Sequence, residues 1–123
     1  MKPRVVQFDH IQIAAPAGCE DVAREFYGGL LGMAEIEKPE ALRPRGGCWF
    51  QCGSRQLHIG VDQDFRPARK AHAAFAVNDL EGLRKALLAH GVNVTNDDSI
   101  PGARRYFSED PWGNRLEFVQ EQR

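Results

Sequence analysis

Four residues of the types that bind divalent metals recur at matching places in the two halves of the chain. His10 and His72 are 62 residues apart, and His58 and Glu117 are 59 residues apart. Imidazole nitrogen and carboxylate oxygen suit divalent first-row metals, and sites built from them keep coordination positions open for chemistry. The spacing therefore predicts a metal centre to which both halves contribute.

The chain around these residues repeats one order of elements: a strand, a helix and then three strands. Five residues from His10 match five from His72, and the short segments around His58 and Glu117 also match. Alternating apolar and polar residues predict the strands, and apolar residues at helical spacing predict the helices. The predicted elements are a strand at 5–14, a helix at 20–32, a short strand and loop over 34–46, strands at 48–52 and 55–62, a strand at 71–77, a helix at 80–90, and strands at 92–95, 104–108 and 115–120.

A tight turn at Gly53-Ser54 would set the register of one hairpin. That turn pairs Trp49 with His58 and Gln51 with Gln56, and paired residues share a face of the sheet. Trp49 and Gln51 should then line the site beside His58. The residues expected on the opposite face, against the helices, are Cys48, Phe50 and Cys52.

Strand alternation also predicts which way the other ligands face. Alternate residues of a strand share a face, so His10 lies with Gln12, and Glu117 lies opposite its apolar neighbours. The facing of His72 stays open, because alanines surround it. Taken singly, a histidine in a strand is usually a hydrogen-bonded or surface residue and a glutamate near the C-terminus is usually solvated; the repeat favours the joint interpretation as ligands.

Composition limits the classes of partner. The chain has 123 residues, 42% of them hydrophobic and 27% charged, which fits one globular domain. The net charge of -1 lacks the basic excess of proteins that bind nucleic acid or anionic lipid, and no apolar run is long enough to cross a membrane. Three cysteines are too few for a secreted disulfide scaffold. We expect a soluble, cytoplasmic protein whose partner is a small molecule or a second copy of the chain.

The sequence resembles the vicinal oxygen chelate superfamily, which includes glyoxalase I, extradiol dioxygenases, fosfomycin-resistance enzymes and bleomycin-resistance proteins. The resemblance covers nearly the whole chain, and its marks are Phe8-Asp9-His10-Ile11, Phe26-Tyr27-Gly28-Gly29-Leu30-Leu31-Gly32, His72 and Asp110-Pro111-Trp112-Gly113-Asn114-Arg115-Leu116-Glu117. It implies an α+β fold: a single glyoxalase-like domain over 1–123, made of two βαβββ modules at about 5–62 and 70–121. The curled mixed sheets of such modules form a cup with the metal at its base.

By this resemblance, His10, His72 and Glu117 fall on the usual ligand positions, and His58 falls where glyoxalase I carries a carboxylate. The family pattern also places Arg105 and Phe107 on the cup side, opposite Glu117. Arg105 would be the only cation there and would indicate an anionic substrate; the alternative is a residue on the rim, in water.

The substrate-binding residues expected from the hairpin and the family pattern are Trp49, Gln51, Gln12, Arg105 and Phe107. Gln12 and Phe107 replace hydroxyl-bearing residues that the fosfomycin enzymes use in their pockets, so fosfomycin modification is disfavoured. The bleomycin-resistance proteins keep the fold without a metal.

The leading hypothesis is a metal-dependent enzyme, with Zn, Ni, Fe, Mn or Co, whose small substrate chelates the metal through two neighbouring oxygens. His58 and Glu117 are the expected catalytic residues. Four protein ligands would leave two positions of an octahedral metal, which favours an isomerase or lyase; if His58 is not a ligand, a dioxygenase with His58 as acid or base becomes an alternative. The other classes considered are a metal-free drug- or metabolite-binding protein and a purely structural dimer module.

The connection between the modules leads to a prediction about assembly. Residues 63–70 are few and include Pro67, so one module does not easily fold onto the other. Cyclic dimers are the commonest assembly, and related glyoxalase-like proteins pair across a two-fold axis. We expect a homodimer with two sites at the interface, each taking His10 and His58 from one chain and His72 and Glu117 from the other.

Overall fold

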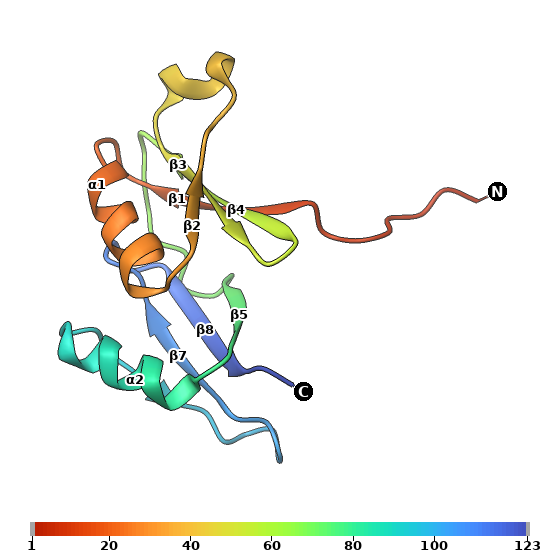
Figure 1. Cartoon of the computed structure of the whole chain (residues 1–123), viewed down its shortest axis with the longest axis vertical. Coiled ribbons are helices and arrows are strands. Elements are labelled where there is room, and N and C mark those ends of the chain that lie inside the picture. The colour runs from red at the N-terminus through yellow and green to blue at the C-terminus, as the bar shows by residue number, and fades with distance from the viewer. Residues whose placement is uncertain (1, 123) are drawn as a thin grey trace.

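Each half of the chain folds into a four-stranded mixed sheet with helical turns against one of its faces (Figure 1). The computed structural model describes residues 2–122. In the first module the elements are β1 (His10–Ala15), α1 (Glu20–Ala23), the π-helical continuation η1 (Arg24–Leu30), β2 (Ala34–Ile36), the 3₁₀ segment η2 (Glu40–Arg45), β3 (Cys48–Cys52) and β4 (Arg55–Val61). In the second they are β5 (Ala73–Val77), α2 (Leu80–Ala89), β6 (Thr95–Asn96), β7 (Arg105–Glu109) and β8 (Arg115–Gln120).

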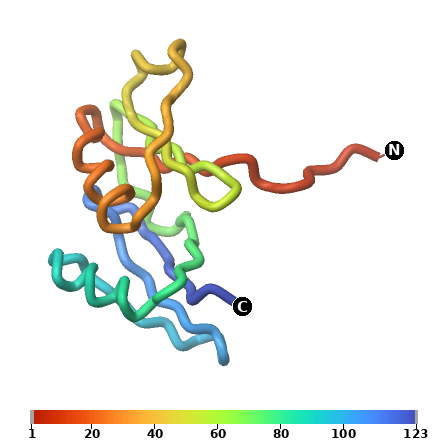
Figure 2. Tube along the Cα trace, in the orientation of Figure 1, coloured from red at the N-terminus to blue at the C-terminus, as the bar shows by residue number. Residues whose placement is uncertain are grey.

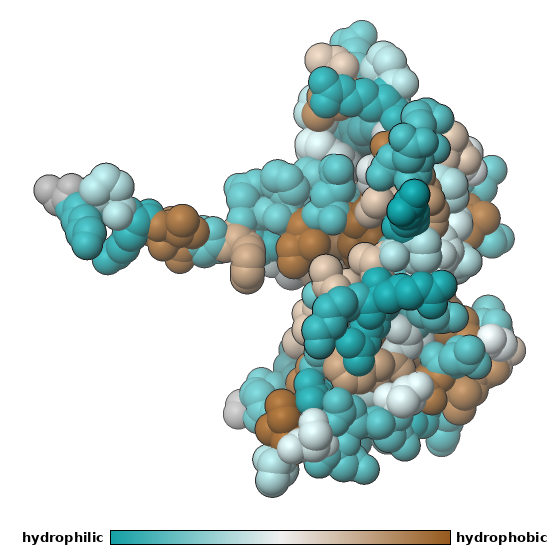
Figure 3. Space-filling view, turned by 180° about the vertical axis from the view of Figure 1, so that it is seen from behind, coloured by the Kyte–Doolittle hydropathy of each residue, from teal (hydrophilic) through white to brown (hydrophobic). Residues whose placement is uncertain are grey.

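The strand order confirms the expected α+β fold of two βαβββ modules. The sheets run β1-β4-β3-β2 and β5-β8-β7-β6, and in each the first strand is parallel to the last while the remaining pairs are antiparallel. Within the part of the chain that the structure describes, no strand pairing joins the two sheets, so a single chain does not close the cup. Seen from behind, the modules form two lobes (Figure 3).

The hairpin between β3 and β4 has the register that its glycine turn predicts. Trp49 pairs with His58, and Gln51 pairs with Gln56. Gly53 has a φ of 59°, a left-handed conformation that glycine adopts without strain. On the opposite face Cys48 and Phe50 are buried as expected, whereas Cys52 is only half-buried.

The first strand is shorter than expected: it begins at His10, not at residue 5. Its partner β4 begins at Arg55, after the hairpin turn, and the first pair in the register is His10 with Gln56. Residues 2–9 therefore have no strand beside them and extend away from the module (Figure 2). Val5, Val6 and Phe8 in this segment are 92%, 75% and 76% exposed.

The strand expected at 92–95 is also shorter, and is limited to β6. The backbone N–H of Val92 donates to the carbonyl of Leu87 and closes the end of α2, so Val92 cannot join a strand ladder. On α2 itself, Leu80 and Leu87 are buried, and Leu88 is exposed.

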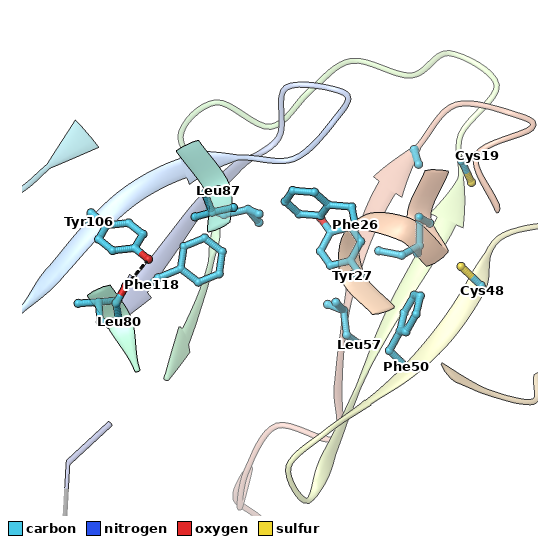
Figure 4. Packing of buried hydrophobic residues seen from close by; sticks show 14 residues of the cluster. Cys19, Phe26, Tyr27, Cys48, Phe50, Leu57, Leu80, Leu87, Tyr106 and Phe118 are labelled. Carbon is cyan, nitrogen blue, oxygen red and sulfur yellow. Dashed lines mark hydrogen bonds between the residues drawn. The ribbon is translucent and has the colours of Figure 1, made fainter. Parts of the chain in front are cut away.

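The core lies between the helical segments and the sheets, and continues from one module to the other (Figure 4). Tyr27 and Phe50 are buried in the first module, and Tyr106 and Phe118 in the second. Tyr106 donates its hydroxyl to the carbonyl of Leu80, so its one polar group is satisfied. With α1, η1 and α2 on one side, no helix covers the opposite face of either sheet apart from η2 at one end of the first (Figure 1).

The loop from Asp110 to Asn114 fastens the modules together. Asp110 accepts hydrogen bonds from the Tyr27 hydroxyl and from the Asn114 amide, both at 2.8 Å. Asn114 also donates to the carbonyl of Ala14 in β1 and accepts from the N–H of Ala68 in the connection, both at 2.9 Å. The most specific family motif of the sequence thus holds the two modules in a fixed arrangement.

No helix among residues 2–122 is both long and apolar enough to cross a membrane.

Candidate functional site

Three rings stack on the uncovered face of the first sheet. The imidazole of His58 lies 3.7 Å from the indole of Trp49, nearly parallel to it, and 4.2 Å from the imidazole of His10. Strand order explains the stack, because β4 carries His58 between β1 and β3. Gln12 pairs with His58 from the other side and shares this face.

The surroundings of His58 favour its neutral imidazole. It is 5% exposed, and its Nε2 lies 3.0 Å from the amide oxygen of Gln56, which can only accept. Nε2 therefore carries the proton and Nδ1 keeps its lone pair. Burial is the main cause that lowers the pKa of His58, and the neighbouring His10 lowers it further. A neutral histidine with a free lone pair can bind a metal or accept a proton.

His10 is oriented by the residue before it. Its Nδ1 lies 3.0 Å from the carboxylate of Asp9. This hydrogen bond is also the main cause that lowers the pKa of Asp9. A carboxylate that accepts from one ring nitrogen leaves the other nitrogen, here Nε2, available for a ligand.

The second sheet carries the other pair, His72 and Glu117. His72 immediately precedes β5 and shares the face of Glu117, which settles its facing. Its Nδ1 lies 2.9 Å from the carbonyl of Lys70, an acceptor, so Nδ1 carries a proton. Its Nε2 then points at Oε1 of Glu117 across 2.9 Å.

This second pair fits a shared cation. A neutral His72 would place a nitrogen lone pair against a carboxylate oxygen, so either a proton or a metal must lie between the two atoms. Histidine nitrogen and carboxylate oxygen bind first-row metals at about 2.1 Å, and two adjacent ligands of an octahedral metal are then about 3 Å apart. The donor types and their separation therefore suit two neighbouring positions of one metal.

Arg105 is occupied by carboxylates, not free to meet a substrate. Its guanidinium donates to Oε2 of Glu117 and to Oδ2 of Asp97, both at 3.1 Å, and its side chain is 15% exposed. The expectation that it is the only cation on this face is wrong. Arg115 lies over the ring of Phe107 at 3.9 Å, and Phe107 packs edge-on against His72.

The four expected ligands thus form two pairs, His10 with His58 and His72 with Glu117. In the described range 2–122, no three or more His, Cys, Asp or Glu side chains gather in a metal-binding group. Of the expected substrate-binding residues, Trp49 and Gln12 lie beside the first pair and Phe107 beside the second. The amide of Gln51 caps the hairpin by donating to two carbonyls, those of Gly53 and Arg55.

Two positioning residues were not predicted from the sequence. Asp9 orients His10, and Gln56 fixes the proton of His58. Gln56 could have been found, since it lies two residues before His58 on the same face of the strand. Asp9 lies inside the strand expected at 5–14, where alternation places its side chain on the face opposite His10; the observed strand begins only at His10.

A larger cavity lies elsewhere. It has a volume of about 710 Å³ and opens on the helical side, between η1 and the end of α2. Phe26, Leu30 and His90 line it, together with residues of the loop after α2. None of the expected site residues reaches it.

Comparisons with known proteins give one family and one fold. The family model described as the Glyoxalase/Bleomycin resistance protein/Dioxygenase superfamily matches residues 7–118. Among solved structures, a protein from Bacillus anthracis assigned to the glyoxalase family is 47% identical, with a TM-score of 0.92 over 99% of this chain and 100% of that one. The comparison with curated proteins finds no match.

More distant structures agree in fold alone. A glyoxalase/dioxygenase from Nostoc punctiforme is 16% identical, with a TM-score of 0.76 and full coverage of both chains. The fosfomycin resistance protein FosX from Listeria monocytogenes is 14% identical, with a TM-score of 0.71 over 98% of this chain and 94% of that one.

Proposed function

Because the chain belongs to the Glyoxalase/Bleomycin resistance protein/Dioxygenase superfamily, we propose that it is a metal-dependent enzyme acting on a small substrate held through two neighbouring oxygens. Its ligands are His10 and His58 from one module and His72 and Glu117 from another. The metal is one of Zn, Ni, Fe, Mn or Co. Isomerase or lyase chemistry is favoured over oxygen insertion.

The observation that carries this proposal is the pair His72 and Glu117. Nε2 of His72 and Oε1 of Glu117 face each other at 2.9 Å, a separation at which the two atoms can share one cation, while the other nitrogen of His72 is held by a backbone carbonyl. The same arrangement recurs at His10, where Asp9 holds one ring nitrogen and leaves the other free. Ring nitrogens that are oriented in this way are typical of metal ligands.

A divalent metal bound by these residues would supply Lewis-acid stabilisation of a negatively charged oxygen on the substrate. The residues themselves position and move protons. Arg105 holds one oxygen of Glu117 and leaves the other toward His72. His58 has one free nitrogen, Nδ1, which either binds the metal or, where His58 is not a ligand, accepts a proton from a carbon next to a carbonyl. Trp49 covers one face of His58 and limits the access of water.

We further propose that the two pairs meet in a homodimer. Each sheet leaves its ligand-bearing face uncovered, and the connection and the Asp110–Asn114 loop fasten the modules so that these pairs stay apart within one chain. A second copy related by a two-fold axis can offer the complementary pair, and the same contact then builds two equal sites.

Metal titration tests the proposal. Chelator-treated protein is titrated with zinc and cobalt in a calorimeter, for the parent and for Glu117→Ala. The parent should bind about one ion per chain, and the variant should lose at least tenfold in affinity. Glu121→Ala, which removes an exposed carboxylate just after β8, serves as the control and should bind as the parent does. No binding by the parent, or equal binding by Glu117→Ala, would refute a metal site at these residues.

A metal-free binding protein of the bleomycin-resistance type is the second candidate. The aromatic stack of Trp49, His58 and His10 favours it, since such a surface holds a planar ligand without a metal. Absence of metal binding, together with quenching of Trp49 fluorescence by planar compounds, would support this alternative over the enzyme.

A further inference from the structure

A small cavity adjoins the three stacked rings on the uncovered face of the first sheet. Its volume is about 220 Å³. Its floor is formed by the sheet. Its wall is formed by η2 and by Lys38, which lies two residues before η2. The lining residues are Gln12, Lys38, Leu42, Arg45, Gly46, Trp49, Ile59, Gly60 and Val61.

The cavity lies beside the candidate site, because two of its lining residues neighbour His58. Gln12 on β1 and Trp49 on β3 both pair with His58 on β4, so the cavity shares two walls with the histidine. It is too small for a whole ligand, since small-molecule sites commonly enclose about 300 to 1,000 Å³. It suits one substituent of a substrate whose reacting part lies at the histidines.

The η2 wall is held in place by two contacts. The N–H of Gly47 donates to the carboxylate of Glu20 at 2.6 Å, and the ammonium of Lys38 donates to the carbonyl of Gly46. An ammonium has three donors, so Lys38 keeps others for a ligand. The cavity wall is therefore anchored without any ligand.

The charge of this cavity is positive. Lys38 and Arg45 line it, and no carboxylate does. Within 4 Å of its charged atoms Arg45 has no acidic partner among residues 2–122, whereas Arg105 on the second sheet is paired with two carboxylates.

We propose that Lys38 and Arg45 form an anion subsite, which binds a carboxylate or phosphoryl group carried by the substrate at a distance from its reacting oxygens. This inference rests on the proposed function, because it names the class of substrate for the same site. It also reassigns the cation expected for that role, since Arg105 holds Glu117 and Asp97.

Fluorescence of Trp49 tests the subsite directly. Trp112 is replaced by phenylalanine, which leaves Trp49 as the single tryptophan of the 123-residue chain. The chelator-treated protein is titrated with benzoate and phenyl phosphate, and with neutral benzamide as the matched probe. Both anions should quench or shift the emission, with benzamide at least tenfold weaker. The Trp49 indole N–H resonance in the parent protein gives the same measurement without the substitution.

Charge-removing variants assign the effect to residues. Lys38→Gln and Arg45→Gln should each weaken the binding of benzoate about tenfold, as expected for loss of a charge-assisted hydrogen bond. Arg43→Gln is the control, because Arg43 lies on the same 3₁₀ segment, carries the same charge, and faces Glu37 outside this cavity. Loss of the Lys38 contact to Gly46 could disturb η2, and Arg45→Gln, which breaks no such contact, then decides.

The outcomes separate this inference from the metal hypothesis. The anion subsite is overturned if benzoate and benzamide bind equally. It is also overturned if benzoate binding is unchanged in Lys38→Gln and Arg45→Gln and reduced in Arg43→Gln. Both conclusions hold whatever the metal titration gives. Benzoate binding that depends on Lys38 and Arg45 in a protein that binds no metal supports the subsite and shifts the function to metal-free binding. Phenyl phosphate stronger than benzoate identifies a phosphoryl group as the preferred anion.

Discussion

At the scale of single residues, a neighbouring acceptor decides which nitrogen of each histidine is free. Lys70 holds His72 by a backbone carbonyl, and Asp9 holds His10 by its side chain. The four ligand types and their repeat could be predicted from the sequence, because both are visible in the residues. The proton positions could not, since a carbonyl acceptor leaves no mark on residue type.

His58 gives a prediction about pH for the chelator-treated protein. The pKa of His58 is lower in the folded state than the ordinary value of 6.5. Above about pH 6.5 the ring is therefore neutral in both the folded and the unfolded chain, and it does not change the free energy of unfolding. As the pH falls below that value, the unfolded chain binds a proton that the folded chain does not, and the free energy of unfolding decreases. Urea unfolding between about pH 7.5 and pH 5 should show this decrease.

Two variants isolate the contribution of His58. His58→Gln should reduce the slope of the free energy of unfolding against pH, by an amount that corresponds to at most one proton. His90→Gln, which removes an exposed histidine at the end of α2, should retain the slope of the parent. The same slope in His58→Gln and the parent would show that the buried ring does not couple folding to protonation.

At the scale of elements, the hairpin could be predicted and the length of β1 could not. The Gly53-Ser54 turn fixes every pair between β3 and β4, and this turn depends on residues that are adjacent in the sequence. The start of β1 depends on where its parallel partner begins, 45 residues later at Arg55. Alternation in residues 5–9 indicates strand propensity, but a strand also needs a neighbour to bond with.

A pair of glycine variants tests the entry to β3. At Gly47 φ is 81°, and a Cβ there would lie 2.0 Å from the carbonyl oxygen of Ile59. Gly47→Ala should therefore lower the free energy of unfolding by about 3 kcal/mol, from left-handed strain and a backbone clash. Gly53 also has a positive φ but has open space around it, so Gly53→Ala should cost only about 1 kcal/mol.

Chemical denaturation of the two alanine variants measures this difference. Equal losses would mean that the approach of Gly47 to β4 relaxes without cost. Because Gly47 anchors the η2 wall through Glu20, Gly47→Ala should also weaken benzoate binding, and Gly53→Ala should leave it unchanged.

At the scale of the whole molecule, the duplicated modules could be predicted from the sequence, but not their arrangement. Asn114 reaches the carbonyl of Ala14, 100 residues away, and the N–H of Ala68 in the connection. These partners are backbone groups, which every residue carries. The motif could be recognised as specific, yet its structural role became clear only from its contacts.

Removal of this amide should weaken the whole fold. Asn114→Ala removes one donor from the buried carboxylate of Asp110 and leaves the Ala68 N–H without its acceptor, so we expect a loss of about 2 to 4 kcal/mol in the free energy of unfolding. Asn96→Ala in the exposed strand β6 is the control, with a change within about 0.5 kcal/mol. A loss for Asn114→Ala no greater than the control's would show that the modules are held by the apolar core alone.

Assembly of the site from two chains predicts complementation between two defective variants. His10→Ala and Glu117→Ala are mixed under conditions in which subunits exchange, and metal uptake is measured. In a mixed dimer both lesions fall in one site and leave the other intact, so about one ion per mixed dimer should be recovered. No recovery after exchange has been proven by mass would place all the ligands of a site in one chain.

The position of the fastening loop late in the chain has a consequence for the order of folding during synthesis. The sheet of the first module contains only residues up to Val61, so it can close on the ribosome before β5 has emerged. The Asp110–Asn114 loop emerges about 50 residues later, and only then can Asn114 donate its hydrogen bond to the carbonyl of Ala14. Tyr27 likewise gains its acceptor only with Asp110. The pair His10 and His58 can therefore form before the second module is synthesised, while the orientation of the two modules is settled only when residues 110–114 have been translated.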